Sequence, residues 1–287
     1  MRIAVTGASG FIGSELLAVL NKMEGVSVTG LTRGASAEQA DVEWRVTDYS
    51  PESLESVLDG IDTVIHLAGV RGTENDPAKF AVNVQMTENL LKAMKKCGAG
   101  RIVFASTMSV YNDDSLMPWK EDIPLGGRSA YGDSKAACEK LIRECEGITY
   151  GIARIAQVVG EGEKRRGMMN VFLDTAREHG TIKVMGKSVL KKQYIYVKDL
   201  VNVLAMLAAG TDSCTVVNVG MQDAYSNLEV AQIVNEVFEN PAPIDYDDSY
   251  PEKGRPFHMD ISRLREELCF EPLDMKAAVE AFKDSGR

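Results

Sequence analysis

The chain has 287 residues, of which 45% are hydrophobic and 26% charged, so it can bury a sizeable core and still cover its surface with charge. This length excludes a peptide hormone, a disulfide-rich miniprotein and an isolated helix pair. The 32 lysines and arginines stand against 42 aspartates and glutamates, a net charge of −10 that repels polyanions and excludes nucleic acid as a general partner.

The cysteines and histidines argue against a disulfide framework and a metal site. The five cysteines are odd in number and widely spaced, as expected for reduced thiols in a cytoplasmic protein. The three histidines share no metal-ligand spacing, and His66 lies in an apolar run typical of the core. No stretch reaches the roughly 18 continuous apolar residues of a membrane helix, so we expect neither a membrane partner nor a metal.

Residues 1 to about 155 alternate short β-branched runs with longer amphipathic stretches, which predicts βαβ units and a doubly wound parallel sheet. Strands are expected near 2–6, 26–32, 42–47, 62–67, 101–106 and 148–154, with helices near 11–23, 51–59, 77–97 and 130–146. Beyond Gly160 the rhythm loosens, and helices are expected near 168–179, 197–209, 226–239 and 274–283. We therefore expect an α/β protein with a main domain over 1–160, onto which 197–220 packs back, and a smaller lobe over 161–196 and 221–287.

The turn between the first strand and the first helix contains Gly7, Gly10, Phe11, Ile12 and Gly13, with glycines in a G-x-x-G-x-x-G spacing. Glycines let backbone N–H groups approach a pyrophosphate, and the helix N-terminus behind the turn carries partial positive charge. In this context the turn predicts that the main domain is a Rossmann-type dinucleotide-binding domain. We then expect the smaller lobe to bind the substrate.

The end of the second strand distinguishes the two nicotinamide dinucleotides. A carboxylate there accepts hydrogen bonds from a free ribose 2′-hydroxyl and repels a 2′-phosphate. This strand ends in Leu31-Thr32-Arg33, so the repulsion is absent and the Arg33 guanidinium can pair with a phosphate. The sequence therefore favours NADP over NAD, with a solvated arginine as the alternative.

Tyr131 and Lys135 stand four residues apart, which places a phenol and an ammonium group on one face of the fourth helix. A nearby cation favours the phenolate form of a tyrosine, so this pair can move a proton. The pattern alone also fits a surface pair on any amphipathic helix. It gains weight from the run Ala105–Tyr111, which offers the hydroxyl of Thr107 at the carboxyl edge of the sheet, where open α/β folds bind ligands.

These motifs resemble the extended short-chain dehydrogenase/reductases of the NAD-dependent epimerase/dehydratase family, a nucleotide-sugar group typified by UDP-galactose 4-epimerase. The resemblance runs over essentially the whole chain. Its matching positions are the glycine turn, Asp48, Ile61–Gly69, Asn83-Val84, Asn89-Leu90-Leu91, Tyr131, Lys135, Arg154, Gly160, Tyr194–Asp199 and Arg255-Pro256.

The resemblance implies roles for individual residues around the cofactor. Asp48 and Tyr49 would contact the adenine, Arg71 would lie near the cofactor phosphates, and Lys135 would lower the pKa of Tyr131 and hold the nicotinamide ribose. Further cofactor contacts are implied for Leu67, Ala68, Gly69, Asn83, Tyr131 and Ile155.

The resemblance also implies a substrate site. Thr107 would hydrogen-bond the reacting sugar oxygen, next to Met108, and Tyr131 would act as the acid/base. Lys192 and Arg255 resemble the paired cations that bind the substrate pyrophosphate, although Lys192 replaces the usual arginine and lacks its planar fork. Gln157 stands where the family usually has an asparagine that contacts the substrate.

The reaction type is narrowed by the two residues after Thr107. Dehydratases of this family typically place an Asp-Glu pair there, whereas this chain has Met108 and Ser109, so elimination of water is not expected. A 4-epimerase and an NADPH-dependent 4-ketoreductase both remain, each acting at C4 of a nucleotide-diphosphate hexose. The family pattern favours the epimerase, and Thr32-Arg33 favours the ketoreductase.

Two hypotheses from other classes stay open. A reductase of small non-nucleotide carbonyls needs no pyrophosphate clamp, so Lys192 and Arg255 argue against it. A non-enzymatic NADP-binding redox sensor needs no acid/base, so the intact set of Thr107, Tyr131 and Lys135 argues against it.

Two surface features complete the expectations. By the resemblance, the helices near 77–97 and 130–146 would pair with those of a second copy in a homodimer. The basic run at 164–166 is either a contact for an anionic substrate or a solvated loop.

Overall fold

The computed structural model describes residues 1–34, 42–163, 167–210, 214–252 and 254–285. The basic run at 164–166 lies outside these residues. The chain divides into two compact units, which are described separately. The first comprises Met1–Asn112, Glu121–Ile155 and Leu200–Asn218, and the second comprises Asp113–Lys120, Ala156–Asp199 and Val219–Arg287.

The first unit is built on a seven-stranded sheet with the strand order β10-β6-β5-β4-β1-β2-β3. Its strands are β1 (Arg2–Thr6), β2 (Ser27–Thr32), β3 (Glu43–Val46), β4 (Thr63–His66), β5 (Arg101–Thr107), β6 (Thr149–Ile155) and β10 (Thr215–Val219). Every neighbouring pair from β6 to β3 is parallel. The expected doubly wound α/β fold is therefore confirmed.

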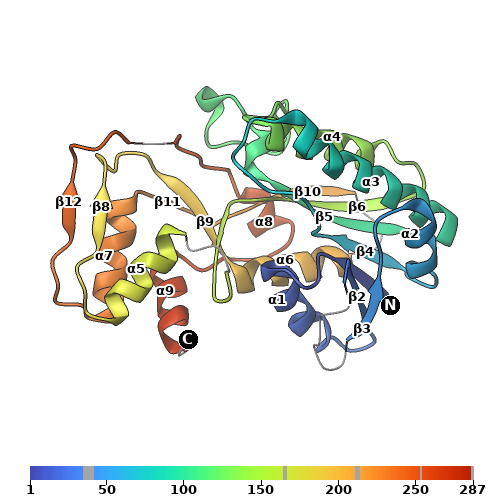
Figure 1. The fold of residues 1–287 in the computed structure, drawn as a ribbon, viewed down its shortest axis with the longest axis horizontal. Coiled ribbons are helices and arrows are strands. Elements are labelled where there is room, and N and C mark those ends of the chain that lie inside the picture. Colours follow the sequence, from blue (N-terminus) through green and yellow to red (C-terminus); the bar gives the residue numbers. More distant parts are fainter. Residues whose placement is uncertain (35–41, 164–166, 211–213, 253, 286–287) are drawn as a thin grey trace. The chain divides into compact units, whose positions relative to one another are not determined.

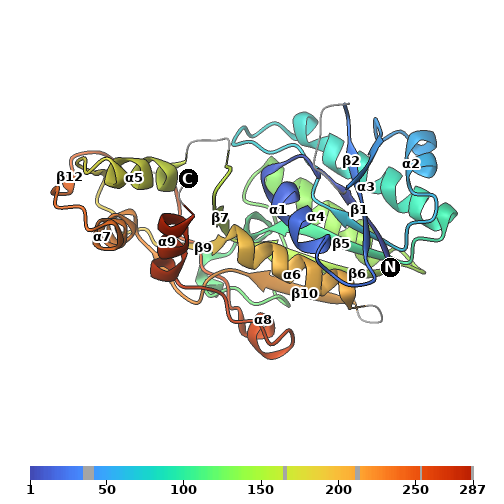
Figure 2. The same cartoon turned by 90° about the horizontal axis from the view of Figure 1, so that it is seen from below.

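Helices cover both faces of this sheet. They are α1 (Phe11–Leu20), α2 (Pro51–Val57), α3 (Pro77–Cys97), α4 (Ala130–Arg143) and α6 (Val197–Ala209), with a 3-10 turn η1 (Met108–Val110) after β5. Figure 1 shows α2, α3 and α4 on one face and α1 and α6 on the other. Figure 2, seen from below, has α1 and α6 in front of the strands.

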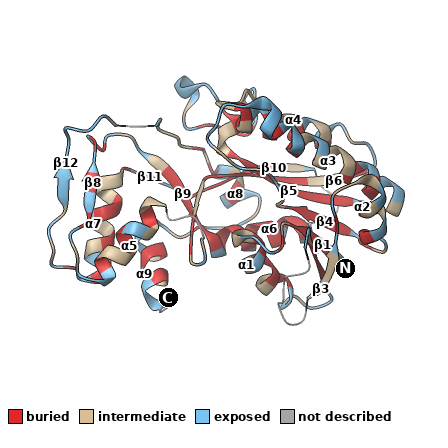
Figure 3. Ribbon diagram, in the orientation of Figure 1, coloured by how far each residue is buried: buried red, intermediate tan, exposed pale blue. Residues whose placement is uncertain are grey.

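The core lies between the sheet and these helices, and the strands are buried along most of their length (Figure 3). One apolar cluster joins α2, α3 and α4 to β4 and β5, with Leu54, Leu90, Phe104 and Ile142 all fully or almost fully buried. Each such side chain contributes about 1.5–3 kcal/mol of transfer free energy. This burial on both faces explains why the strand sequences are near-continuous apolar runs.

The bounds of the helices follow local signals in the sequence. α3 begins at Pro77, where Asp76 accepts a hydrogen bond from the Ala78 nitrogen, and it ends at Cys97, before Gly98 with a φ of +79°. α4 ends at Arg143, before the expected residue 146, and the chain then turns through Gly147 at a φ of +81°.

The strand order reverses beside β1, which pairs with β2 on one side and with β4 on the other. The loops that leave β1 and β4 therefore diverge at the same edge of the sheet. In open α/β folds this point is where ligands bind.

In its described residues, the second unit contains two small sheets and three longer helices. Its elements are η2 (Asp114–Leu116), β7 (Gln157–Val159), α5 (Met168–Arg177), β8 (Lys183–Met185), β9 (Lys192–Tyr196), β11 (Ala224–Tyr225), α7 (Asn227–Phe238), β12 (Asp245–Asp247), α8 (Ser262–Glu266) and α9 (Met275–Asp284). In one sheet β9 lies between β7 and β11, and in the other β8 pairs with β12.

The segment Asp113–Lys120 belongs to the second unit, although it falls within the expected main domain. The backbone nitrogen of Trp119 donates to the His258 carbonyl at 3.0 Å, and Trp119 forms a β-bridge with Met259. Such a pairing across 140 residues leaves no signal in local hydrophobic periodicity. None of the described helices is both long and apolar enough to span a bilayer.

Candidate active site

Two glycines, Gly7 in the turn after β1 and Gly13 in the first turn of α1, occupy positions with no room for a side chain. Gly7 has a φ of +67°, and a Cβ on it would lie 2.9 Å from the Ala68 nitrogen. A Cβ on Gly13 would lie 2.3 Å from the Gly7 carbonyl oxygen, so this glycine allows α1 to pack against the turn. Gly10 caps α1 without a side chain, which leaves the first N–H groups of the helix accessible to an anion.

A cavity of about 620 Å³ lies beside this turn, at the ends of β1, β2, β3 and β4. Its volume is within the range usual for small-molecule sites. The predicted cofactor residues that line it are Gly7, Gly10, Thr32, Arg33, Asp48, Tyr49, Leu67, Ala68 and Gly69. Phe11, Ile12 and Gly13 lie in the first turn of α1, and Arg71 is exposed in the loop after β4. The residues present therefore fit a nucleotide in this cavity.

The edge of the cavity at the end of β2 carries a cation and no carboxylate, as expected for a phosphate contact. Thr32 Oγ1 donates to the Gly34 carbonyl at 3.0 Å, which turns the chain after the strand. The exposed side chain of Arg33 lines the cavity and has no ion-pair partner in the described part of the chain. No carboxylate occupies the end of β2.

Asp48 and Tyr49 close the cavity after β3. Hydrogen bonds from Ser50 lower the pKa of the Asp48 carboxyl, which is therefore ionised at neutral pH. Tyr49 is held at a φ of 65°, and burial raises the pKa of its phenol. Asn89 of α3 fixes this corner by donating to the Tyr49 carbonyl at 3.0 Å.

The predicted acid/base pair lies on α4. Ser129 caps this helix by accepting a hydrogen bond from the Gly132 nitrogen, so Tyr131 sits in the first turn and Lys135 one turn later. Tyr131 packs edge-on against Phe80 with ring centroids 5.7 Å apart. Burial raises the pKa of its phenol, while the charge of Arg71 acts to lower it.

Lys135 is 5% exposed, and its Nζ lies 4.1 Å from the centroid of the Phe104 ring. Burial lowers the pKa of this ammonium group to about 8. This contact of Nζ is with an aromatic ring, so the ammonium donors can also reach the hydroxyls of a bound ribose. This donor set fits the role implied for Lys135.

Thr107 ends β5 and is 9% exposed. Its hydroxyl caps η1 by accepting from the Ser109 nitrogen at 3.2 Å and donates to the Ser109 hydroxyl at 3.4 Å. The second contact is long, so the Thr107 proton can turn to a substrate oxygen. Across the sheet Thr107 is in register with Ile155, the last residue of β6 and 6% exposed.

An uncharged set of buried hydrogen bonds, here called the neutral network, joins Thr6, His66, Thr87, Asn83 and Ser134. Thr6 Oγ1 accepts from the nitrogens of Leu67 and Ala68, so its proton is directed to His66 Nδ1 at 2.7 Å. Burial lowers the pKa of His66 to about 3, and the ring is neutral at physiological pH. His66 is the core histidine that the sequence predicts.

Asn83 lies beneath the loop that lines the cavity and does not line the cavity itself. Its Oδ1 accepts from the Val70 nitrogen at 2.7 Å, and its Nδ2 donates to the Val70 carbonyl at 3.1 Å. The same nitrogen reaches the Ser134 hydroxyl at 3.3 Å, and Ser134 donates to the Tyr131 carbonyl at 2.8 Å. Asn83 therefore supports the loop that carries Val70, and its direct contact with the cofactor stays a prediction from the resemblance.

The predicted substrate residues outside the first unit lie in the second. Gln157 begins β7 and is in register with Tyr194 of β9. Lys192 begins β9 and forms a β-bridge with Phe257, which brings it to the segment that carries the exposed Arg255. The pairing of these backbones places the two predicted cations on adjoining segments of this unit. Met108 begins η1 and is half-buried.

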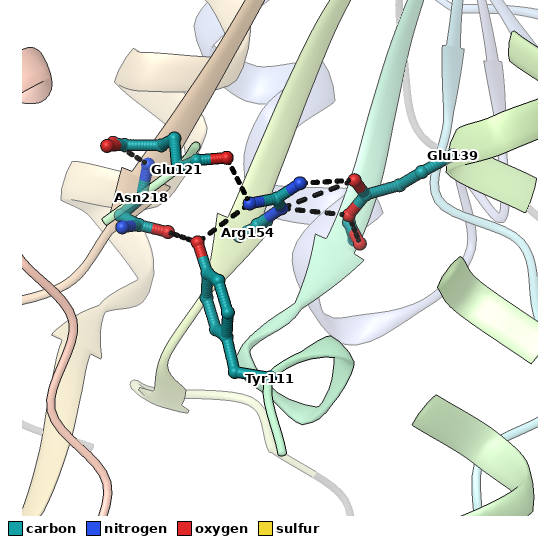
Figure 4. A network of polar contacts seen from close by, with 6 residues as sticks. Tyr111, Glu121, Glu139, Arg154 and Asn218 are labelled. Atoms are coloured by element: carbon teal, nitrogen blue, oxygen red, sulfur yellow. Dashed lines mark hydrogen bonds and ion pairs between the residues drawn. The ribbon is translucent and has the colours of Figure 1, made fainter. Parts of the chain in front are cut away.

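A second set of buried polar contacts was not foreseen from the sequence. This charged network comprises Ser106, Tyr111, Glu121, Glu139, Arg154 and Asn218 and is shown in Figure 4. Arg154 matched the family pattern, but no local signal linked it to Glu139. The detectable signal is the spacing Lys135 to Glu139, which places a carboxylate one turn after the lysine on the same helix face.

The model of the NAD dependent epimerase/dehydratase family matches residues 3–220 of this chain. Among solved structures, UDP-N-acetylglucosamine 4-epimerase from Bacillus cereus is similar, with 31% identity and a TM-score of 0.85 over 98% of this chain and 94% of the other.

Curated relatives of different activities match at similar identity. UDP-glucuronic acid decarboxylase 1 of Arabidopsis thaliana is 30% identical over 95% of this chain, which spans 66% of that protein's length. dTDP-6-deoxy-L-talose 4-dehydrogenase (NAD(P)(+)) of Kitasatospora kifunensis is 30% identical over 94% of this chain and 91% of that protein.

Proposed function

Because the chain belongs to the NAD-dependent epimerase/dehydratase family, we propose that it is a nucleotide-sugar 4-epimerase acting on a nucleotide-diphosphate hexose. The observation that carries the proposal is the buried Lys135 ammonium group, unpaired among the described residues and one helical turn from Tyr131. This arrangement suits proton transfer beside a bound dinucleotide, and the cavity at β1, β2, β3 and β4 suits the cofactor's adenosine.

Each part of the first unit's site has a proposed role in cofactor binding or in proton transfer. The N–H groups of the turn after β1 bind the cofactor pyrophosphate, and Asp48 and Tyr49 lie at the adenine. When bound, the nicotinamide dinucleotide supplies the acceptor and donor for the hydride of the sugar carbon. Tyr131 takes the proton of the C4 hydroxyl and later returns it, while Thr107 hydrogen-bonds the same oxygen. Lys135 holds the ribose hydroxyls and stabilises the phenolate of Tyr131 by its charge.

The substrate pyrophosphate is assigned to Lys192 and Arg255 of the second unit. Arg255 supplies a planar fork for two phosphate oxygens, and Lys192 supplies a single point charge. Gln157 contributes an amide to the same substrate.

A 4-ketoreductase is the second candidate, because β2 ends in Thr32-Arg33 without a carboxylate and Arg33 lines the cavity. This rim suits a 2′-phosphate and therefore NADPH, which a reductase consumes in each turnover. We accordingly propose a preference for NADP over NAD. A ratio of kcat/KM that favours NAD would contradict it.

Loss of water is not part of the proposal, since neither Met108 nor Ser109 can act as a second acid or base. Decarboxylation needs no such pair, because oxidation at C4 of a uronic acid creates a β-keto acid. UDP-glucuronic acid therefore belongs among the substrates tested.

We also propose a cytoplasmic homodimer. The five cysteines of the chain are all free, which fits a reducing compartment. We assign the dimer contact to α3 and α4, the two helices for which the resemblance implies it. Light scattering that shows only monomer would reject the dimer.

The test is incubation of the purified enzyme with UDP-, dTDP-, CDP- and GDP-hexoses and UDP-glucuronic acid. Exchange of C4 isomers without added stoichiometric cofactor supports the epimerase. Dependence on stoichiometric NADPH with a 4-keto sugar supports the ketoreductase, and release of CO₂ from UDP-glucuronic acid supports a decarboxylase. Turnover of none of these sugars overturns the proposed function.

A further inference from the structure

The centre of the charged network is a fully buried ion pair. Arg154 and Glu139 side chains are 1% and 0% exposed, and Arg154 NH2 lies 2.8 Å from Glu139 Oε2. Arg154 Nε donates to both carboxylate oxygens, at 3.1 and 3.2 Å (Figure 4). Ser106 donates to Glu139 Oε1 at 2.5 Å. The carboxylate is therefore held from β5 and β6 at once.

Arg154 also contacts Tyr111 and Glu121, the residues on either side of the segment 112–120. Its NH1 donates to the Tyr111 hydroxyl at 2.8 Å and to the Glu121 carbonyl at 2.9 Å. The Tyr111 hydroxyl in turn donates to Asn218 Oδ1 at 2.6 Å, and the Asn218 nitrogen donates to Glu121 Oε1 at 2.8 Å. The guanidinium thus joins β6 to the segment after Thr107, and Tyr111 and Glu121 continue the network to Asn218 of β10.

A buried ion pair such as Glu139–Arg154 contributes little net stability to a fold. Moving two charges out of water is costly, and well-packed apolar side chains of similar volume are often as stable or more so. Two of the contacts adjoin the proposed machinery: Ser106 precedes Thr107 in β5, and Glu139 follows Lys135 by one helical turn.

We propose that Glu139 and Arg154 form a positioning pair for the reaction: the Glu139 carboxylate stabilises the positive charge of Lys135, and Arg154 fixes that carboxylate and the segment after Thr107. This inference rests on the proposed function for its kinetic consequences, but not for the effect of Glu139 on Lys135.

Of the titratable and charged groups around Lys135, Glu139 is the one that can stabilise its ammonium charge at neutral pH. Burial opposes the lysine charge, and so does Arg71 from the loop after β4. A Cys138 thiolate on the same helix would favour the lysine charge more than Glu139 does, but burial raises the pKa of this thiol, so it is uncharged at neutral pH. His66 of β4 is neutral as well, and Phe104 of β5 offers only its ring face. Glu139 is thus the group among these that offsets burial with a negative charge.

The test uses the full chain and a readout that needs no turnover. Protein labelled with ¹³C in lysine is titrated, and the Lys135 Cε resonance is assigned by its absence from Lys135→Met. The variants are Glu139→Gln, the double variant Glu139→Gln/Arg154→Met, and Arg154→Lys. The matched control is Glu144→Gln, the same change at an exposed position of α4's C-terminus.

We expect Glu139→Gln to lower the pKa of Lys135 by about one pH unit. The double variant removes the unpaired buried cation, so we expect it to unfold close to the wild-type temperature while its Lys135 titrates as in Glu139→Gln. Arg154→Lys keeps a cation beside Glu139 and should retain the wild-type Lys135 titration, as should Glu144→Gln. The double variant remains informative even if Glu139→Gln does not fold.

Kinetics give the second readout. Loss of Lys135 charge weakens stabilisation of the Tyr131 phenolate, so kcat of the double variant should fall about tenfold and its pH profile should move to higher pH, with KM for the sugar little changed. A double variant with wild-type Lys135 titration and pH profile would overturn the positioning role. Absence of turnover in the wild type would instead overturn the proposed function, which the titration does not require.

Discussion

The neutral network holds α4 from α3 and the charged network holds it from β5 and β6, and the two do so with different physics. In the first, Asn83 and Ser134 form hydrogen bonds of 2.7–3.3 Å between uncharged groups. In the second, Glu139 and Arg154 bring two full charges into the interior. Removing one member of the neutral network leaves a dipole unpaired, whereas removing one member of the charged pair leaves a buried ion.

Because of this difference, we expect substitutions in the two networks to change the free energy of unfolding by different amounts. Losses in the neutral network should be graded, at about 1–3 kcal/mol for each unpaired polar group. Losses in the charged network should be large for single changes and small for paired ones. The following substitutions test this contrast.

Arg154→Met should have the largest effect. It leaves the Glu139 carboxylate buried with only the Ser106 hydroxyl among its present partners, so the free energy of unfolding should fall by about 3–5 kcal/mol. Adding Glu139→Gln should recover most of this loss. Denaturant titration of the single and the double variant measures the loss and its recovery. A loss below about 1 kcal/mol in Arg154→Met would contradict the claim that single changes in the charged network are the more costly ones.

His66 should make the neutral network sensitive to acid. Its pKa is about 3 in the folded protein, below the usual histidine pKa of 6.5, so unfolding takes up a proton between these pH values. The stabilisation from the neutral ring is present above pH 6.5 and is lost as pH falls, at about 1.4 kcal/mol per pH unit. His66→Asn should remove this slope from the pH dependence of unfolding, and a slope that persists would refute the assignment. The exposed His179, at a φ of 52° that asparagine tolerates, provides the control His179→Asn.

Asn83→Ala should reduce the free energy of unfolding by about 2 kcal/mol, because both backbone groups of Val70 lose their partner. Since Val70 lines the cavity, dinucleotide affinity should also fall, by about tenfold on calorimetric titration. The control is Asn21→Ala at the exposed end of α1. If Asn83→Ala binds the dinucleotide as tightly as wild type, the loop does not depend on this side chain.

Ser134→Ala should have the smallest effect. It removes one hydroxyl that joins Asn83 to the Tyr131 carbonyl, so about 1 kcal/mol of stability should be lost. kcat should fall no more than about fivefold, because the backbone of α4 still fixes Tyr131. A loss as large as that of Arg154→Met would show that the two networks do not differ as described.

The sequence predicts the first unit well because its signals are local. Strands such as Arg2–Thr6 and Arg101–Thr107 are apolar runs between clear breakers, and Pro77 and Gly98 mark the bounds of α3. Short strands of the second unit, such as β8, carry only three residues and no periodic signal.

The range of a signal along the sequence decides which site residues can be predicted from it. The glycine turn and the Tyr131-Lys135 spacing are local patterns with a mechanism, and the structure places Gly7, Thr32 and Arg33 at one cavity. The contact between Glu139 and Arg154 joins residues 15 positions apart in two elements, and it forms because α4 packs against β5 and β6. Such long-range polar contacts require the fold to be known.

Tyr131→Phe is the most direct test of the proposed chemistry, since it deletes one hydroxyl and keeps the ring that packs on Phe80. The measurement is kcat for exchange of C4 isomers of the best nucleotide sugar, together with dinucleotide affinity. The account predicts that kcat falls at least about 100-fold while the cofactor still binds. A Tyr131→Phe enzyme that exchanges isomers at the wild-type rate would contradict it.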